Sequence, residues 1–307
     1  MRYRDLGKTG LKVSEVGLGC GPLGGDPKVD YRPLLDRSLE LGVNFYDTAD
    51  FYGSYRSEEW LGKAFEKKRE QVILATKFGT IPGVGKDWSV GHMQKCLAES
   101  LRRLRTDYID LYQLHSPNEA ILPNHELLEA LRKLKQEGTI RFYGISLDGG
   151  QFCIDAIREW QLDAVQILFN LFNLEPACSF RACREAGVGL IIKAPLDSGM
   201  LGGTLTSEKA IGEDDPRARW GEERTAQRSK LMKAMEFLSN GTGRTWSQAA
   251  LQFVLSYGAV STVIPGTTSI RHLEENVAAA GGRLTNDEMR RLHGLMGGEF
   301  AEMNLGW

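Results

Sequence analysis

Several features that would indicate other classes of protein are missing from this sequence of 307 residues. It has 38 Lys and Arg against 40 Asp and Glu, without a long block of one sign, which argues against the positive field that binds nucleic acid or anionic lipid. No stretch approaches the ~18 uninterrupted apolar residues of a membrane-spanning helix, and the N-terminal segment lacks the apolar run of a signal peptide. We therefore expect a cytoplasmic protein whose partner is a small molecule.

Cysteine and histidine are too few and too scattered to predict a disulfide framework or a metal centre. The five cysteines include no CxxC pair, so we expect reduced, buried thiols at Cys20, Cys96, Cys153, Cys178 and Cys183. The five histidines include no H-x-H pair, whereas a catalytic metal needs several converging ligands. A metal-dependent hydrolase is therefore a weaker alternative, and we expect no metal.

What the chain does contain is one pattern that recurs at intervals of roughly thirty residues. A short run rich in β-branched residues is followed by a polar or Gly-containing loop and then by apolar residues at helical spacing. Near-continuous apolar strands that alternate with helices indicate a parallel sheet covered by helices. The predicted strands are residues 15–19, 43–47, 72–77, 108–115, 140–146, 164–169, 188–193 and 260–265.

Eight strand–helix units favour a closed α/β fold, the (β/α)8 TIM barrel, over an open doubly wound sheet. We expect one domain over residues 1–307, because barrels of roughly 250 residues or more commonly form one unit. The extra length falls in a long loop after the seventh strand, residues 196–225, and in a tail after the last helix, residues 297–307. The loop is either a mobile cover over the barrel mouth or a solvated surface insertion.

One glycine-rich stretch resembles a dinucleotide-binding motif without its context. "GCGPLG" at residues 19–24 fits the G-x-G-x-x-G pattern of Rossmann folds. Pro22 and Pro27 keep the chain irregular until about Asp30, so no helix opens there to bind a pyrophosphate. The sequence therefore disfavours a Rossmann domain.

Polar residues end three consecutive predicted strands. Asp47 ends the second strand, Lys77 the third and His115 the fourth. Tyr52 follows on the loop that leaves the second strand. In a parallel barrel the carboxyl ends of the strands meet at one mouth, with neighbours ~4.8 Å apart. We therefore predict that these four side chains lie together, although each alone would be read as a turn, packing or surface residue.

This combination of side chains suits proton transfer. A free tyrosine has a pKa of about 10, and a neighbouring ammonium such as Lys77 favours its phenolate. Asp47 would keep Lys77 charged and in place, and His115 would orient a substrate oxygen or share the proton transfer. Because no side chain donates hydride, a site that protonates a carbonyl oxygen implies a nicotinamide or a flavin.

The residues at these strand ends, with further segments in the same order, resemble those of the aldo-keto reductases. The likeness extends from about Arg2 to Leu295 and includes "NFYDTADFYGS", "ILATKFG", "DLYQLHSP", "IRFYGIS", "AVQILFN", "APLDSGMLGG" and "VIPGTTSIRHLEENVAA". It implies a (β/α)8 barrel with an N-terminal hairpin across its bottom and a nicotinamide cofactor bound in extended form. It also implies a catalytic tetrad, with the tyrosine as general acid for carbonyl reduction: Asp47, Tyr52, Lys77 and His115.

The resemblance further assigns residues to the cofactor. Ser146 and Gln166 match positions that bind the nicotinamide carboxamide, and Asp47 borders the same site. Leu147 replaces an Asn found in many members, and Lys193 stands where many have an aromatic residue that stacks on the nicotinamide. The other matched positions fall into three groups, which lie on the first-strand loop beside the cofactor, along the pyrophosphate and at the adenosine end. In this order they are Gly19 and Cys20; Pro195, Leu196, Asp197, Gly199 and Leu201; and Gly266, Thr267, Thr268, His272, Glu275 and Asn276.

The adenosine end leaves the choice of cofactor open. Gly266 and His272 stand where members selective for the 2′-phosphate often have Lys and Arg. Arg271, or Thr267 with Thr268, are the residues that could compensate. We expect NADP(H), with NAD(H) or use of both as the alternative.

Together these observations predict an NAD(P)H-dependent oxidoreductase that interconverts an aldehyde, ketone or aldose with the corresponding alcohol or lactone. The resemblance also leaves a second candidate, a cofactor-binding regulatory subunit of an ion channel with little turnover. A long extra N-terminal segment or an exposed apolar patch would favour that candidate. Neither feature is evident in the sequence.

Overall fold

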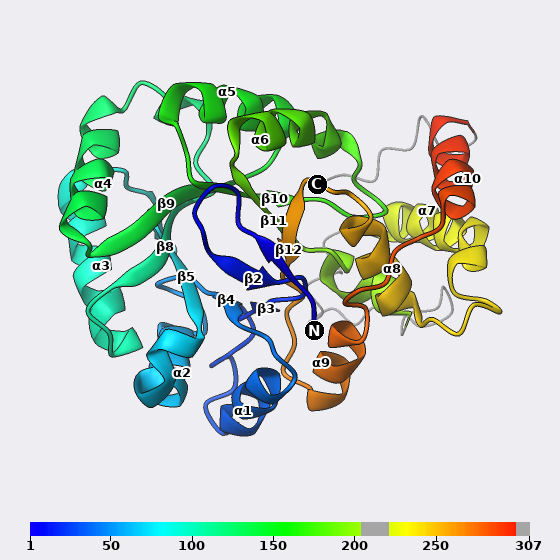
Figure 1. Cartoon of the computed structure of the whole chain (residues 1–307), viewed down its shortest axis with the longest axis horizontal. Helices are drawn as coiled ribbons and strands as arrows, with labels where there is room; N and C mark the ends of the chain where they lie inside the picture. Colours follow the sequence, from blue (N-terminus) through cyan, green and yellow to red (C-terminus); the bar gives the residue numbers. More distant parts are fainter. Residues whose placement is uncertain (204–220, 299–307) are drawn as a thin grey trace.

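Eight parallel strands lie side by side in a ring in the computed structural model, which describes residues 1–203 and 221–298 (Figure 1). Parallel bridges from Val16 to Val263 and from Gly19 to Gly266 join the first strand of the ring to the last. The predicted (β/α)8 barrel is therefore confirmed, and each predicted strand region contains one strand. These are β3 (Leu18–Gly19), β4 (Phe45–Asp47), β5 (Ile73–Phe78), β8 (Ile109–His115), β9 (Ile140–Leu147), β10 (Ala164–Leu168), β11 (Gly189–Lys193) and β12 (Val260–Val263).

Helices cover the outside of the ring (Figure 1). Several begin at a residue whose side chain accepts a hydrogen bond from the first turn, such as Ser89 before α3 and Thr245 before α8. A cap of this kind contributes about 1 kcal/mol and fixes where a helix begins. The helices in the described residues are α1 (Arg32–Glu40), α2 (Arg56–Phe65), α3 (Val90–Leu104), α4 (His125–Glu137), α5 (Gly150–Trp160), α6 (Phe180–Ala186), α7 (Gly221–Ala234), α8 (Trp246–Leu255), α9 (Ile270–Val277) and α10 (Asn286–Gly297).

The alternation of side chains along each strand divides the inside of the barrel into an apolar floor and a polar mouth. Residues of the floor belong to one buried apolar cluster. Two positions further along the same strand, on the same face, the residue is polar. Phe45 precedes Asp47, Ala75 precedes Lys77, Leu111 precedes Gln113, Ala164 precedes Gln166, and Ile191 precedes Lys193.

An antiparallel hairpin lies across the floor end of the barrel, as predicted. It is formed by β1 (Tyr3–Asp5) and β2 (Lys12–Ser14), drawn in dark blue in Figure 1. Leu6, Leu11 and Val13 from this hairpin complete the apolar cluster of the floor. The other end of the barrel, where the strands end, is therefore the mouth.

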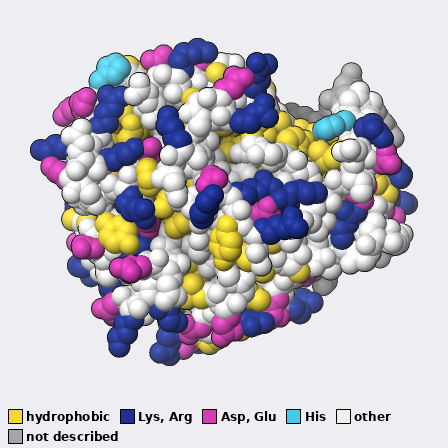
Figure 2. All heavy atoms as spheres, in the orientation of Figure 1, with side chains coloured by type: hydrophobic (Ala, Val, Ile, Leu, Met, Phe, Trp, Pro, Cys, Tyr) yellow, Lys and Arg dark blue, Asp and Glu magenta, His cyan; other side chains and the backbone are white. Residues whose placement is uncertain are grey.

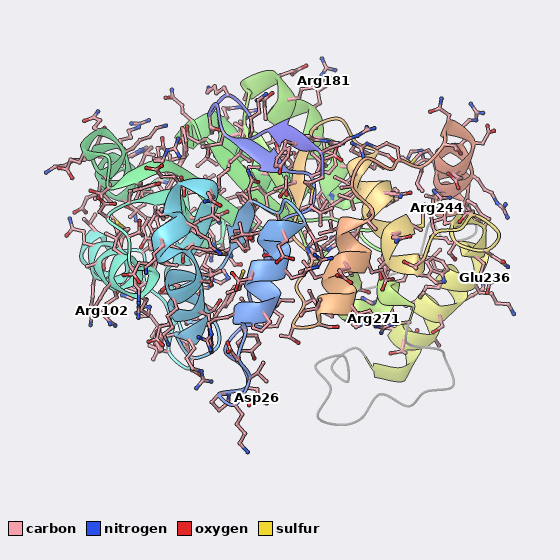
Figure 3. All side chains as sticks on the ribbon, turned by 60° about the horizontal axis from the view of Figure 1, so that its bottom comes forward. Asp26, Arg102, Arg181, Glu236, Arg244 and Arg271 are labelled. Atoms are coloured by element: carbon pink, nitrogen blue, oxygen red, sulfur yellow. The ribbon has the colours of Figure 1, made fainter. Side chains whose placement is uncertain are left out.

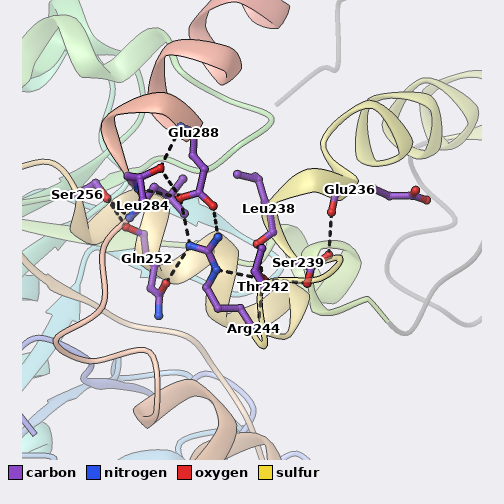
Figure 4. A network of polar contacts seen from close by, with 10 residues as sticks. Glu236, Leu238, Ser239, Thr242, Arg244, Gln252, Ser256, Leu284 and Glu288 are labelled. Atoms are coloured by element: carbon purple, nitrogen blue, oxygen red, sulfur yellow. Dashed lines mark hydrogen bonds and ion pairs between the residues drawn. The ribbon is translucent and has the colours of Figure 1, made fainter.

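Helix α10 is attached to α8 and its flanking loops by polar contacts (Figure 4). Arg244 forms an ion pair with Glu288 and donates to Gln252 Oε1 at 3.4 Å. The main-chain N–H of Leu284 donates to Ser256 Oγ at 2.9 Å. These contacts hold the beginning of α10 against the barrel.

One expectation from the sequence was wrong, and one hairpin was not predicted. Cys178 is exposed, because its side chain lies on a short helical turn at the surface, whereas the other four cysteines are buried and all five are free. The loop after β5 contains an unpredicted hairpin of β6 (Thr80–Ile81) and β7 (Gly85–Lys86). Strands of two residues are too short to show an alternating pattern.

The predicted loop over the mouth and the predicted tail fall largely outside the described residues, which omit 204–220 and 299–307. The interpretation of the loop as a cover of the mouth therefore stays a prediction. By contrast, the irregular chain predicted after residues 19–24 is confirmed, because α1 begins only at Arg32.

The surface carries charges of both signs. Figure 2 shows Lys and Arg side chains interspersed with Asp and Glu over the face that the hairpin occupies. Charges of opposite sign at such spacing cancel much of each other's field. Among the residues that the structure describes, no helix combines the length and apolarity needed to cross a bilayer.

An ion pair between α2 and α3 is buried behind the barrel wall. Arg103 Nε lies 2.6 Å from Glu58 Oε2, and the two side chains are 7% and 0% exposed. Thr76 Oγ1 from β5 donates to Glu58 Oε1 at 2.6 Å. This contact joins two helices to the strand that carries Lys77.

Removing the arginine would leave the carboxylate of Glu58 buried and uncompensated. We expect Arg103→Met to lower the free energy of unfolding, measured by urea denaturation, by about 3–5 kcal/mol. The matched control is Arg102→Met, because Arg102 projects from the outside of α3 (Figure 3) and its pair with Glu99 is exposed. The control should change the same quantity by less than about 1 kcal/mol. Equal losses in the two variants would contradict the assignment.

Candidate active site

The mouth of the barrel holds Asp47 and Lys77 as a buried ion pair. Their strands, β4 and β5, are neighbours in the ring. Lys77 Nζ lies 2.6 Å from Asp47 Oδ2 and also donates to the carbonyl oxygen of Thr48 at 2.7 Å. Burial is the largest single influence on the pKa of Lys77 and lowers it, but Asp47 and the other acidic groups nearby outweigh it and leave the pKa raised. Lys77 is therefore a fixed positive charge.

Two glutamine side chains complete the surroundings of Asp47. Gln113 Nε2 and Gln166 Nε2 donate to Asp47 Oδ1 at 3.1 and 2.6 Å. The sequence predicted Gln166 as a site residue but missed Gln113. The missed signal was strand alternation, because Gln113 lies two residues before His115 and must point the same way.

Tyr52 folds back over the ion pair from a tight turn after β4. Gly53 has a φ of +58°, and a Cβ there would lie 2.1 Å from the carbonyl oxygen of Leu23, so only glycine fits. The turn places Lys77 Nζ 5.1 Å from the centre of the Tyr52 ring. It also places Tyr52 OH 3.4 Å from His115 Nε2. The structure thus brings the four predicted side chains together.

The surroundings of Tyr52 keep its phenol protonated. Burial raises the pKa of Tyr52 above its ordinary value, although the charge of Lys77 acts in the opposite direction. The sequence predicted the effect of Lys77 but not the larger effect of burial. Tyr52 therefore keeps its proton at neutral pH.

His115 is a neutral imidazole. Burial, followed by the charges of Lys77, Lys86 and Lys193, lowers the pKa of His115 to about 2. The ring of Phe51 stacks on it with centroids 5.2 Å apart, and Lys86 Nζ donates to its carbonyl oxygen at 2.7 Å. Neither Phe51 nor Lys86 was predicted. The described residues contain no group of three or more His, Cys, Asp or Glu side chains that could hold a metal ion.

Apart from Asp47, the predicted cofactor residues lie on the other five strands of the ring or in the segments that follow them. Around the barrel these strands follow in the order β9, β10, β11, β12 and β3, and β3 returns to β4. Ser146, Gln166 and Lys193 lie on the first three, the loop 266–268 follows β12, and Gly19 ends β3. The predicted proton-transfer residues and the predicted cofactor residues therefore occupy two adjoining arcs of the ring, which we call the proton-transfer arc and the cofactor arc.

A row of polar contacts links the two arcs. Lys193 Nζ donates to Ser146 Oγ at 3.2 Å, and Ser146 Oγ donates to Gln166 Oε1 at 3.1 Å. Gln166 in turn donates to Asp47, and Lys193 pairs with Asp148 at 3.1 Å. Hydroxyl and amide groups in one row can both donate to and accept from a planar carboxamide. This side of the mouth therefore fits a nicotinamide.

Cys20 and Leu147 face away from the mouth. Both are fully buried in the apolar layer outside the strands. The main-chain N–H of Cys20 donates to the carbonyl oxygen of Asp47 at 2.7 Å, and its own carbonyl oxygen accepts from Ser57 Oγ at 2.8 Å. Cys20 therefore supports the loop beside Asp47, and Leu147 supplies no amide toward the mouth.

The segment after β11 is held from beneath by buried side chains. Asp197 Oδ2 accepts from Arg228 Nε of α7 at 2.8 Å, and both side chains are 0% exposed. Leu201 and Pro195 are also buried, while Leu196 and Gly199 are partly exposed. The chain turns through positive φ at Ala194, Asp197, Ser198 and Gly199. The side chain of Asp197 thus attaches this segment to α7.

The loop before α9 is the open end of the cofactor arc. Gly266 and Thr268 are exposed, whereas Thr267 is buried and its Oγ1 accepts from the main-chain N–H of Ser269 at 3.0 Å. Ser269 Oγ accepts from the main-chain N–H of His272 at 3.4 Å and so caps α9. A helix begins here with its N–H groups and positive dipole end near exposed backbone, which suits a phosphate.

The side chains on the first turns of α9 differ in charge and in exposure. Arg271 is exposed at the start of the helix (Figure 3), and one of its terminal nitrogens lies 3.0 Å from His272 Nε2. Glu275 is partly buried and Asn276 is buried. Arg271 is therefore the cation that the helix offers beside His272.

Comparison with known proteins agrees with this arrangement. The model of the Aldo/keto reductase family matches residues 15–296. The uncharacterized oxidoreductase YqkF of Bacillus subtilis (strain 168) is 36% identical over 306 residues, which cover 95% of each chain. L-galactose dehydrogenase of Arabidopsis thaliana is 33% identical over 298 residues, which cover 91% of this chain and 88% of that protein.

Solved structures agree as well. The holo form of the aldo-keto reductase AKR11C1 from Bacillus halodurans superimposes with a TM-score of 0.81 at 33% identity, over 96% of each chain. The chain therefore belongs to the aldo/keto reductase family of NAD(P)-dependent oxidoreductases.

Proposed function

We propose that this enzyme interconverts the carbonyl group of a small aldehyde, ketone or aldose with the corresponding alcohol or lactone, using NADP(H). The observation that carries the proposal is the cluster in the mouth. A protonated Tyr52 lies beside the buried pair of Lys77 and Asp47 and beside a neutral His115. Such a cluster is suited to move one proton to or from a carbonyl oxygen.

Tyr52 is the general acid in reduction and the general base in oxidation. As its proton leaves, the charge of Lys77, 5.1 Å from the ring centre, stabilises the phenolate that forms. A substrate oxygen bonded to Tyr52 OH lies within reach of His115 Nε2, which can orient it without adding a charge. The nicotinamide supplies the hydride to the carbonyl carbon.

The place of each predicted cofactor residue around the mouth indicates which part of the cofactor it binds. Ser146 and Gln166 hold the carboxamide, and the loop 266–268 with the beginning of α9 holds the phosphates. Arg271 is the cation best placed for a 2′-phosphate, which supports NADP(H) over NAD(H). Asp197 contributes through the shape of its segment, because its carboxylate is buried against Arg228.

A sugar substrate suits the polar character of the mouth. One relative is named as a dehydrogenase of L-galactose, and the inward positions above the floor are polar on β4, β5, β8, β10 and β11. Buried polar groups discriminate strongly for substrates that can bond to them. A steady-state assay of NADPH and NADH with aldehydes, ketones and aldoses, in both directions, tests cofactor and substrate class together.

The role of Tyr52 gives a direct prediction. Tyr52→Phe removes only the hydroxyl, so we expect turnover to fall by about 10²–10⁴-fold while cofactor affinity, measured by fluorescence titration, stays unchanged. The matched control is Tyr55→Phe, because Tyr55 lies three residues further on and is 49% exposed. The control should retain turnover. A Tyr52→Phe enzyme that turns over normally would reject the role.

The neutral state of His115 predicts a pH dependence of stability. Its pKa is about 2 in the folded protein and about 6.5 in the unfolded chain. Below a pH of about 6.5 the unfolded chain therefore binds one more proton at this residue, and folding stability falls by about 1.4 kcal/mol per pH unit as the pH drops. We expect His115→Gln to remove this contribution in urea unfolding measured between about pH 6 and pH 5. Identical slopes in the two proteins would show that His115 is not held neutral.

The position of Arg271 predicts cofactor preference. Arg271→Met should raise KM for NADPH by about tenfold or more, because a charge-assisted bond to phosphate is lost, and should leave KM for NADH nearly unchanged. Arg181→Met is the control, since Arg181 is an exposed arginine on α6 (Figure 3). An equal change for both cofactors would place the selectivity elsewhere.

A further inference from the structure

Lys193 occupies an unusual place for a lysine, because it points into the barrel mouth. It ends β11, pairs in register with Leu168 of β10, and lies two positions after the floor residue Ile191 on the same face. Its side chain is only 20% exposed. A lysine at the surface would extend into water, so this ammonium is held in the mouth by its contacts.

Two contacts hold the ammonium of Lys193. Nζ donates to Ser146 Oγ at 3.2 Å and pairs with Asp148 Oδ1 at 3.1 Å. The two partners differ in exposure, because Ser146 is buried whereas the side chain of Asp148 is 62% exposed. Water and salt screen the charge of an exposed carboxylate. Asp148 therefore offsets only part of the field that Lys193 exerts inside the mouth.

The field of Lys193 reaches the groups around the site. The charges of Lys77, Lys86 and Lys193 all depress the pKa of His115, after the larger effect of burial. Burial also lowers the pKa of Lys193 itself, and Asp148 opposes this change. The pair with Asp148 thus favours the charged form of the lysine. The charge of Lys77, by contrast, is matched by a fully enclosed Asp47.

Any ligand that bonds to Ser146 lies beside this ammonium, because the two atoms are one hydrogen bond apart. The nicotinamide carboxamide is the group that we assign to Ser146 and Gln166. The nicotinamide ring carries a positive charge when oxidised and none when reduced. A neighbouring cation therefore repels the oxidised ring and leaves the reduced ring nearly unaffected.

We propose that Lys193 sets which redox form of the nicotinamide cofactor the enzyme prefers, favouring the reduced form, and that Asp148 moderates this preference. The proposal rests on the function proposed above, since it assumes that the cofactor binds at Ser146. It gives Lys193 an electrostatic role in place of the stacking that an aromatic residue would provide. Preferential binding of the reduced form raises the share of enzyme that carries it and makes the bound nicotinamide a weaker hydride donor.

The test is the ratio of two dissociation constants, one for the oxidised and one for the reduced cofactor, measured by equilibrium fluorescence or calorimetric titration without substrate. Two unit charges about 4 Å apart interact by about 1 kcal/mol even in bulk water, which corresponds to about fivefold in a ratio of binding constants. We therefore expect Lys193→Met to lower the ratio by about fivefold or more, where the ratio is the dissociation constant of the oxidised cofactor divided by that of the reduced cofactor. Lys193→Arg should keep the ratio, because it keeps the charge.

A third variant acts in the opposite direction. Asp148→Asn removes the moderating carboxylate while leaving Lys193 in place, so at a mildly acidic pH, which keeps the ammonium protonated, we expect it to raise the ratio by about two- to fivefold. A purely structural role of Lys193 would weaken both forms of the cofactor together and would not move the ratio. The opposite shifts in Lys193→Met and Asp148→Asn are therefore specific for charge.

The proposal is overturned if Lys193→Met binds both forms with the wild-type ratio, or if Lys193→Arg behaves like Lys193→Met. It is also overturned if Asp148→Asn leaves the ratio unchanged. Failure of the wild-type enzyme to bind either form would instead overturn the function proposed above, and this proposal with it. The two failures are distinguishable. Failure of the Lys193 proposal is seen in the variants while the wild-type enzyme still binds the cofactor, whereas failure of the proposed function is seen in the wild-type enzyme itself.

Discussion

The buried charge of Lys77 is the constraint on which the rest of the site depends. An ammonium enclosed in a barrel costs several kcal/mol unless an opposite charge and hydrogen bonds compensate it. Asp47 supplies the charge, and the carbonyl oxygen of Thr48 supplies a further bond. Asp47 then needs partners for its second oxygen, which Gln113 and Gln166 provide. The need to satisfy one cation therefore fixes β4, β5, β8 and β10 relative to one another at the mouth.

Burial also determines the protonation states of Tyr52 and His115, the two groups at which we propose that the substrate binds. It raises the pKa of Tyr52 and lowers the pKa of His115, because in each case the charged form loses water. The ring of Phe51, which contacts the rings of both Tyr52 and His115, is part of this burial.

The fold could be predicted from the sequence because its signals are local. Strand periodicity and helix spacing are carried by neighbouring residues, and three strand ends with complementary side chains located the tetrad. Contacts between residues distant in the sequence could not be derived in this way. Arg228 reaches Asp197 across 31 positions and forms a buried ion pair with its carboxylate. The pKa of Tyr52 was also beyond the sequence, since it depends on the degree of burial and not on which residues are present.

The two lysines of the mouth differ in how their charges are compensated. The charge of Lys77 is matched by an enclosed Asp47, yet it still acts on both Tyr52 and His115. The charge of Lys193 is matched by an exposed Asp148 and therefore extends further across the mouth. Ser146 and Gln166 connect these two pairs through hydrogen bonds. The predicted proton-transfer residues and the predicted cofactor residues are thus joined both by charge and by hydrogen bonds, because a shift of Gln166 would disturb Asp47 and Ser146 together.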